Sequence, residues 1–364
     1  MSTESRFPIP DSPFPSTEGT DLFSQQQSNR VRSRILIAGF IAFFAWLGFG
    51  GDWILWQATR DAGGGSEGGY RHVIPWLGLA LTLGATIAAI VSWRRGPERV
   101  LWSTNAFEVT EAANEDERRL VNVVEEMAIA SGIPRPRIWI VPDDDPNAFA
   151  TGRDPSEAHV AVTAGLLARL DRDELQGVIA HEMGHVKNLD VRLMTLLAAL
   201  VGAVALVGDF MSRSLRRGAR VPVGSLGGGR SGGGKKGGNP ALVIVLVLWV
   251  LSWLLAPLVT RLLAMGVSRK REYLADAMSA QFTRNPAALA SALHKIEHAA
   301  APTRSMKRGS AHLCIADPLG RKLTNREGAF AELFGTHPPM AIRVAKLKAM
   351  AYQRDARGET GDGR

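Results

Sequence analysis

Two long apolar runs near the N-terminus constrain the fold of this chain more than any other feature. Residues 35–56 contain a single charge, Asp52, and residues 73–93 contain none. A helix needs about 20 predominantly apolar residues to cross the hydrocarbon core of a bilayer. Both runs are apolar on all sides rather than along one stripe, which is unlike the surface helix of a soluble protein. The pair therefore predicts a membrane hairpin over residues 35–93.

The charges that flank the hairpin predict its orientation. Three arginines directly precede the first run and three follow the second, whereas the Gly-rich connection holds two arginines against two acidic residues. Positive charge accumulates on the cytoplasmic side of membrane spans. The N-terminus and the residues after the hairpin are therefore expected in the cytoplasm. The flanking arginines are Arg30, Arg32, Arg34, Arg94, Arg95 and Arg99.

The ends of the chain and its cysteine content also carry expectations. Residues 1–34 are polar and rich in Ser, Pro and Gln, and we expect a disordered tail because they cannot bury enough apolar surface to offset their entropy. No cleavable signal peptide is visible, and residues 351–364 are expected to be a second disordered tail. The single cysteine, Cys314, excludes an intramolecular disulfide and fits a reducing compartment. We expect Cys314 to be a small buried residue.

A second apolar hairpin, residues 193–263, leaves the number of membrane spans open between two and four. Its apolar runs, 193–210 and 241–259, enclose a Gly-rich basic loop at residues 212–239. If both runs span, this loop lies outside, against the positive-inside rule. The alternative is a hairpin against the inner leaflet, with the loop on anionic headgroups. We favour two further spans because both runs are long enough and the loop is flexible.

The residues between and after the two hairpins, 103–192 and 264–350, are expected to form one soluble domain in two parts. Residues 115–130 show helical periodicity. Residues 137–141 and 159–163 resemble short strands, and turn-forming residues lie between them. The domain is therefore expected to combine helices with a small sheet.

A His-Glu-x-x-His motif, formed by His181, Glu182 and His185, lies on a predicted helix of this domain. Asp171 can begin that helix through a capping box with Glu174. Residues four apart share one helix face, so the two imidazoles can bind one metal ion. The glutamate is placed to take a proton from a metal-bound water. The apolar positions of the helix put this motif on the buried side, where polar groups need partners such as a metal.

Two histidines make an incomplete site, because catalytic zinc usually has three protein ligands and an open position. Glu272 and Asp276, just after the second hairpin, are four apart and share one helix face. One could bind the metal while the other accepts the free N–H of a ligating imidazole. The spacing alone leaves open which does which, and it also allows ordinary ion pairs with the neighbouring cations. His294 and His298 are also four apart, but no third ligand accompanies them, so a solvated face is expected.

Together these motifs resemble the HtpX-type membrane zinc metalloproteases, which are relatives of the CAAX prenyl-endopeptidases. The resemblance covers residues 115–347 and includes the Arg-Glu-Tyr-Leu-Ala-Asp segment at 271–276 and the His-Pro-Pro segment at 337–339. It implies a mainly α integral membrane protein. A zincin-like (gluzincin) metalloprotease domain with a small β-sheet is joined in this family to membrane helices, here two to four.

The resemblance also implies how the metal is held. His181, His185 and Glu272 match the ligands of one Zn²⁺ per chain, and Asp276 matches the residue that supports a ligand. Glu182 matches the general base. The spacing left open whether Glu272 or Asp276 binds the metal, and the resemblance favours Glu272 as the expected ligand.

The resemblance further implies three elements that act on the substrate. Asn147, Ala148 and Phe149 match an edge strand that pairs with the substrate backbone, as extended peptides do when they add to an exposed sheet edge. His337 matches a residue that donates a hydrogen bond to the oxyanion of the tetrahedral intermediate. Arg343 matches an arginine that helps hold the substrate or the intermediate.

The leading hypothesis is a membrane-anchored zinc-dependent endopeptidase that cleaves membrane or misfolded proteins at the cytoplasmic face of the bacterial inner membrane, in protein quality control. The expected partners are polypeptide substrates and the lipid bilayer. Nucleic acid is not expected, because the basic loop lacks interleaved aromatic residues and much of the net charge of +8 lies beside apolar runs. The alternatives are a CAAX-type prenyl-protein endopeptidase and a non-catalytic membrane scaffold or holdase.

Overall fold

The computed structural model of this chain divides into two compact units. One comprises Met1–Arg32, Pro97–Thr195 and Met265–Arg364, and the other Ser33–Gly96 and Leu196–Ala264. The residues that the structure describes are 22–62, 73–200, 244, 246–252, 269–299, 313–315 and 338–359.

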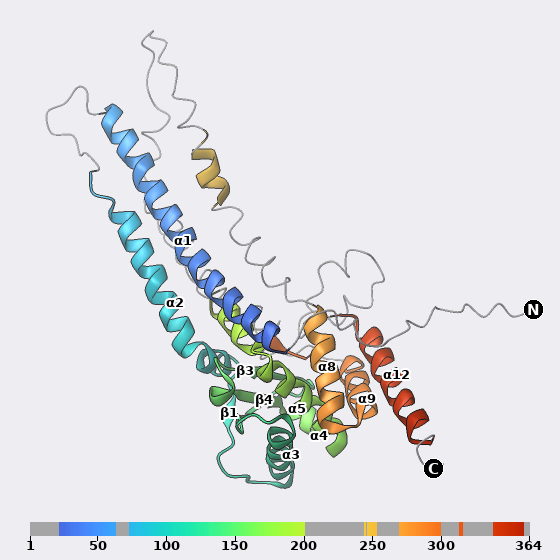
Figure 1. The fold of residues 1–364 in the computed structure, drawn as a ribbon. Helices are drawn as coiled ribbons and strands as arrows, with labels where there is room; N and C mark the ends of the chain where they lie inside the picture. Colours follow the sequence, from blue (N-terminus) through green and yellow to red (C-terminus); the bar gives the residue numbers. More distant parts are fainter. Residues whose placement is uncertain are drawn as a thin grey trace, which may run out of the picture. The chain divides into compact units, whose positions relative to one another are not determined.

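Two long helices, α1 (Leu22–Ala62) and α2 (Trp76–Ser103), form the predicted hairpin (Figure 1). Each is long and apolar enough to cross a membrane by length and composition, over Ser24–Gln57 in α1 and over the whole of α2. Large apolar side chains are exposed along both helices, as lipid-facing residues of an integral membrane protein are. They include Ile35, Trp46, Phe49, Leu79, Leu83, Ile87 and Ile90.

Asp52, the only charge in the first apolar run, has a structural role between the two helices. Its carboxylate is buried and accepts hydrogen bonds from the backbone N–H groups of Leu77 (3.2 Å) and Gly78 (2.5 Å). These are among the first N–H groups of α2, which have no partner within that helix. A Cβ atom on Gly48 would lie 2.6 Å from the Cα atom of Gly78. The absence of side chains there lets the helices approach closely enough for Asp52 to cap α2.

Both helices extend beyond the predicted runs. Helix α1 begins at Leu22, so residues 22–34 are helical rather than part of a disordered tail, while residues 1–21 lie outside the described residues. Polar side chains of residues 22–34 form hydrogen bonds with residues far away in the sequence, which the local sequence does not predict. Gln26 Nε2 donates to the carbonyl of Lys187 (2.8 Å), and Asn29 Nδ2 donates to the carbonyl of Asn188 (3.0 Å). Residues 201–243 and 253–268, with most of the second apolar hairpin and its basic loop, are also outside the described residues.

A four-stranded sheet lies in the unit that carries the motif helix. Its strand order is β1-β2-β4-β3, in which β2 and β4 are parallel and the two outer pairs are antiparallel. Strands β2 and β4 confirm the sequence-based prediction, whereas the short β1 and β3 were not predicted as strands from periodicity. The strands are β1 (Phe107–Glu108), β2 (Arg137–Val141), β3 (Ala148–Thr151) and β4 (His159–Thr163).

Helices of the same unit pack around α5, the motif helix. Helix α5 contacts α3, α8, α9 and strand β3, and α12 contacts α8 and α9 (Figure 1). Residues 190–200 form a further helical stretch after α5. The bounds are α3 (Glu115–Ser131), the 3-10 turn η1 (Pro155–Glu157), α4 (Ala164–Arg169), α5 (Arg172–Lys187), α8 (Arg269–Thr283), α9 (Pro286–Glu297) and α12 (Met340–Glu359).

The start of α5 is fixed by the predicted capping box. The Asp171 carboxylate accepts from the N–H of Glu174 (2.9 Å), and the Glu174 carboxylate accepts from the N–H of Asp171 (3.0 Å). Glu174 is buried and also accepts from Ser291 (2.7 Å) and Lys295 (2.6 Å) of α9. The cap that begins the motif helix therefore also attaches it to α9.

Glycines of α5 allow its neighbours to approach. A Cβ atom on Gly177 would lie 3.0 Å from the backbone of Leu289 in α9, and one on Gly184 would lie 3.3 Å from Cα of Ala275 in α8. Contacts this short between helices require a residue without a side chain at the crossing. The close crossing at Gly184 brings α8, and with it Glu272, beside the motif histidines.

Candidate metal centre and active site

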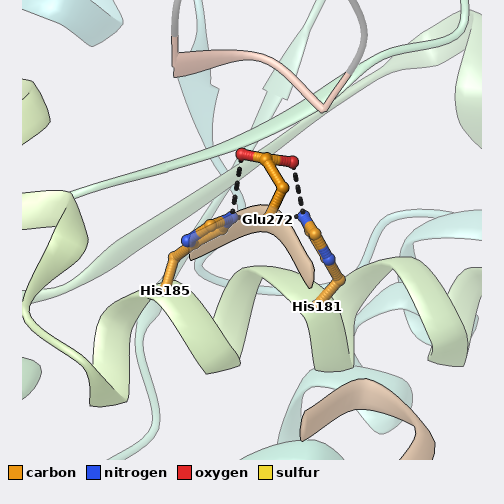
Figure 2. A group of neighbouring side chains, drawn as sticks. All are labelled: His181, His185 and Glu272. Carbon is orange, nitrogen blue, oxygen red and sulfur yellow. Dashed lines mark hydrogen bonds and ion pairs between the residues drawn. The ribbon is translucent and has the colours of Figure 1, made fainter. Parts of the chain in front are cut away.

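Three side chains from two helices converge on one point. The Nε2 atoms of His181 and His185, on adjacent turns of α5, lie 3.2 Å apart. The carboxylate of Glu272, on α8, reaches both of them, with one oxygen 3.7 Å from Nε2 of His181 and the other 3.5 Å from Nε2 of His185 (Figure 2). One donor atom from each residue lies within 4.8 Å of the other two.

The donor set of this cluster fits a metal ion. Two imidazole nitrogens and a carboxylate oxygen are the ligand types of His₂Glu zinc sites, which keep a further position open for water or substrate. His181 and Glu272 are buried and His185 is half-buried. A cation bound here would be largely shielded from water and would neutralise the buried carboxylate. His181, His185 and Glu272 are therefore compatible with a metal centre.

His181 is held by a buried ion-pair network. Its Nδ1 atom lies 3.0 Å from Oδ1 of Asp276. Arg343 donates to both oxygens of that carboxylate, from Nε (2.9 Å) and Nη2 (2.7 Å), and its Nη1 atom lies 3.2 Å from Glu272. Burial alone would raise the pKa of Asp276, but the charge of Arg343 and the hydrogen bonds of His181 and Arg343 outweigh it and lower the pKa. Asp276 therefore remains a carboxylate that accepts the imidazole N–H.

His185 has an aspartate of its own, which the sequence analysis missed. Oδ2 of Asp190 lies 3.2 Å from Nδ1 of His185. Asp190 is buried and follows the end of α5. The sequence shows an acidic residue five positions after His185. Whether its side chain points to His185 depends on the conformation of the turn that follows α5, which the sequence pattern does not give.

The two histidines differ in pKa because their surroundings differ. Burial lowers the pKa of His181 to about 4, and the hydrogen bond to Asp276 opposes this only in part. Burial also acts to lower the pKa of His185, but the hydrogen bond to Asp190 and the charge of Glu272 raise it to about 9. The two rings therefore differ in their affinity for a proton, and a metal ion bound by both Nε2 atoms would compete with a proton at His185.

Glu182 lies beside this cluster with a pKa near neutrality. Burial raises the pKa of its carboxyl group to about 7, with a further rise from Glu272 and opposing contributions from His185 and the backbone N–H of Ala150. A group with such a pKa can both accept and return a proton at physiological pH.

The three converging side chains and Glu182 line one cavity together with apolar residues. Besides the three converging side chains and Glu182, the lining includes the charged Asp190 and Arg271 and several apolar side chains. The lining residues are Ala150, His181, Glu182, His185, Asp190, Val191, Met194, Arg271, Glu272, Leu313, Cys314 and Ile315.

The predicted substrate strand lies where expected but is partly covered. Strand β3 is at the edge of the sheet, yet its outer side pairs with residues 313–315: Phe149 forms a bridge with Cys314, and the N–H of Ile315 donates to the carbonyl of Ala148 (2.9 Å). Asn147, Ala148 and Phe149 are all buried. The Ala148 carbonyl is thus engaged by residues 313–315, a pairing between distant segments that local sequence does not reveal.

The remaining predicted residues have different outcomes. Arg343 is fully buried against Asp276 and Glu272, and its Nη1 atom donates to the carbonyl of Ile315 (3.3 Å). These contacts attach Arg343 to two acidic side chains of the candidate metal centre, and the contact with substrate that the resemblance implies stays a prediction. His337 lies outside the described residues. Cys314 is buried, as predicted. His294 and His298 are exposed, as predicted.

Comparisons with known proteins find related sequences. The sequence profile of peptidase family M48 matches residues 114–351. The chain is 47% identical over 238 residues to a protease HtpX homologue of Tropheryma whipplei (strain Twist), covering 65% of this chain and 74% of the relative. It is 38% identical over 278 residues to that of Lactobacillus helveticus (76% and 87%), and 36% identical over 329 residues to that of Lactiplantibacillus plantarum (90% and 100%).

A solved structure, that of S. mikatae Ste24p, aligns with 90% of this chain and 66% of its own length. The TM-score is 0.42 and the sequence identity 16%. This likeness is too distant to support an inference about the chain, so the sequence comparisons stand by themselves.

Proposed function

This chain belongs to peptidase family M48, and on that premise we propose that it is a zinc-dependent endopeptidase that cleaves polypeptides at a membrane. Its curated relatives are protease HtpX homologues, and it has two helices apolar enough to span a bilayer. The observation that carries the proposed reaction is the convergence of His181, His185 and Glu272 beside the buried Glu182.

The three converging side chains would hold one Zn²⁺ per chain. Two imidazoles and a carboxylate form the donor set of His₂Glu catalytic zinc sites, and Asp276 and Asp190 each accept the Nδ1–H of one imidazole, which leaves Nε2 free to bind the metal. When bound, Zn²⁺ supplies Lewis-acid chemistry that activates water and polarises the scissile carbonyl.

Side chains around this centre would carry the proton and the developing charge. Glu182 accepts a proton from the attacking water and returns it to the leaving amine, which its pKa of about 7 permits at neutral pH. Arg343 keeps Asp276 and Glu272 in place through its buried guanidinium. His337, assigned by the family resemblance alone, would donate a hydrogen bond to the developing oxyanion.

The proposed setting is the cytoplasmic face of a bacterial inner membrane, where the protein would remove damaged or misassembled membrane proteins. The arginines that flank the first apolar hairpin support this orientation. The role can be tested by expressing Glu182→Gln in the native membrane and identifying what stays bound. Retention of misfolded membrane proteins is the expected result; retention of prenylated peptides alone would favour the CAAX-type alternative.

A metal-dependence experiment tests the proposed reaction. The protein is purified in detergent, treated with a chelator, and assayed on unfolded casein before and after addition of Zn²⁺. Cleavage should disappear with the metal and return with Zn²⁺, while His185→Ala should neither retain zinc nor recover. Cleavage that persists at the original rate after the metal has been removed would contradict the proposal, and an inert zinc-loaded protein would favour a scaffold.

A further inference from the structure

Asp190 is a buried carboxylate on which three separate elements meet. One of its oxygens lies 3.2 Å from Nδ1 of His185 in α5. The other accepts a hydrogen bond from Nδ2 of Asn29 in α1 (2.8 Å) and lies 3.8 Å from Nη1 of Arg271 in α8. Asp190 and Asn29 are 2% and 3% exposed, so these contacts form in a largely dehydrated setting where polar groups depend on one another.

The backbone before Asp190 adopts an unusual conformation to place it there. Helix α5 ends at Lys187, and Leu189 has a φ of +59°, in the left-handed region that is unfavourable for a branched side chain without special support. The helical stretch 190–200 begins directly afterwards. Directly after this turn, the Asp190 side chain contacts His185, which lies two residues before the end of α5.

Asn29 supports both halves of this turn. Its Nδ2 atom donates to the carbonyl of Asn188 (3.0 Å) as well as to Asp190. One turn earlier in α1, Gln26 donates to the carbonyl of Lys187 (2.8 Å) rather than to Asp190. Residues 22–32 of α1 belong to the same compact unit as the metal cluster. The first helix therefore contributes directly to the surroundings of His185.

The arrangement parallels that of the other metal-binding imidazole. Nδ1 of His181 contacts the carboxylate of Asp276, which accepts a hydrogen bond from Arg343. Nδ1 of His185 contacts the carboxylate of Asp190, which accepts a hydrogen bond from Asn29. Carboxylates that accept the N–H of a ligating imidazole fix the ring and its tautomer, and their loss typically weakens metal binding about 10–100-fold.

We propose that Asp190 is a positioning residue for the metal ligand His185, and that Asn29 of the first helix holds Asp190 in the orientation this requires. The inference rests on the proposed function, because it concerns the same metal centre. It adds that residues of α1, ahead of the first apolar run, are part of the metal-binding structure. Metal affinity should therefore depend on a side chain that is far from the motif in sequence and does not touch the metal.

The test measures Zn²⁺ affinity of the full-length protein in detergent by competition with a chromophoric chelator, with the visible spectrum of the Co²⁺ form as a second readout. Asp190→Asn should bind Zn²⁺ about 10–100-fold more weakly. Asn29→Leu, which keeps a branched side chain with the same number of non-hydrogen atoms but removes both N–H donors, should also weaken Zn²⁺ binding and alter the Co²⁺ spectrum. Gln26→Leu is the matched control, since it removes a hydrogen bond to the same turn without touching Asp190, and its affinity should equal wild type.

The outcomes separate the possible explanations. Wild-type affinity in folded Asn29→Leu and Asp190→Asn would overturn the inference and leave the proposed function intact. Equal weakening in Gln26→Leu and Asn29→Leu would also overturn it, because a general loss of helix packing would then be the cause. If Asp190→Asn does not fold, Asn29→Leu and Gln26→Leu still decide between these results. Absence of Zn²⁺ binding by the wild-type protein would contradict the proposed function and the inference together.

Discussion

Oδ1 of Asp276 lies 3.0 Å from Nδ1 of His181, and both side chains are buried. The contact directs Nε2 of the imidazole towards Glu272 and His185. Asp276 and Glu272 are one turn apart on α8, so a single helix supplies both a candidate ligand and the group that orients another ligand.

Replacing Asp276 by Asn should weaken Zn²⁺ binding about 10–100-fold, because an amide is a weaker acceptor for the imidazole N–H than a carboxylate. The zinc content after dialysis against graded chelator concentrations would measure the loss. Glu126→Gln is a suitable control. Glu126 makes an exposed ion pair with Arg172, and neither residue contacts His181, His185 or Glu272 through a hydrogen bond or ion pair. Equal zinc retention in both variants would contradict the assignment.

Arg343→Met should destabilise the protein strongly. The guanidinium is fully buried and contacts both Asp276 and Glu272, so its removal leaves two buried carboxylates without their cation, at a cost of about 3–5 kcal/mol. Arg343→Lys should be intermediate, because an ammonium keeps the charge but cannot make the two-pronged contact. Thermal unfolding of the detergent-purified variants measures the order, and a Met variant as stable as wild type would be inconsistent with this network.

Gly177→Ala should also be destabilising, by about 1–3 kcal/mol. The added methyl would lie 3.0 Å from the backbone of Leu289, which cannot rotate away as a side chain can. Gly39→Ala is the matched control, since no atom lies within 4 Å of the Cβ position there. Thermal melting of the two variants tests this, and similar melting temperatures would show that α9 can move aside.

His159 should make the protein less stable as the pH falls. Its Nδ1 atom accepts a hydrogen bond from Trp139 (3.1 Å), and burial, followed by the charge of Arg137, lowers its pKa below the ordinary value of 6.5, with Glu98 and Glu157 opposing. The unfolded chain therefore binds a proton near pH 6.5 that the folded protein still excludes, so the free energy of unfolding decreases as pH falls through 6.5.

The measurement for His159 is the change in melting temperature between pH 7.5 and pH 5.5. His159→Gln should show a smaller decrease than wild type, because it removes the group whose pKa is lowered by folding. An identical decrease in wild type and His159→Gln would mean that this histidine does not contribute.

Local patterns predicted those parts of the fold that depend on local signals. The capping box at Asp171 and the short runs rich in Val and Ile at β2 and β4 depend on neighbours in sequence, and all appear as predicted. The helical start of α1 was not predicted, because Asn29 finds its partners at Asn188 and Asp190. Composition alone cannot predict a contact between residues so far apart in the sequence.

The candidate site shows the same division. Spacing alone brought His181 and His185 to one helix face, and family resemblance was needed to choose Glu272 over Asp276. Neither indicated that Asp190 would turn back to His185, because that depends on the left-handed backbone of Leu189. Neither indicated the pairing of residues 313–315 with β3, which requires two segments to meet in the folded protein.

The central claim is that Glu182 moves the proton while His181, His185 and Glu272 hold the metal. It is tested most directly by measuring zinc content and casein cleavage in the same preparation of Glu182→Gln. The amide occupies nearly the same volume but cannot accept a proton, so zinc content should equal wild type while cleavage falls at least about 100-fold. Zinc-loaded Glu182→Gln that cleaves casein at the wild-type rate would contradict the account.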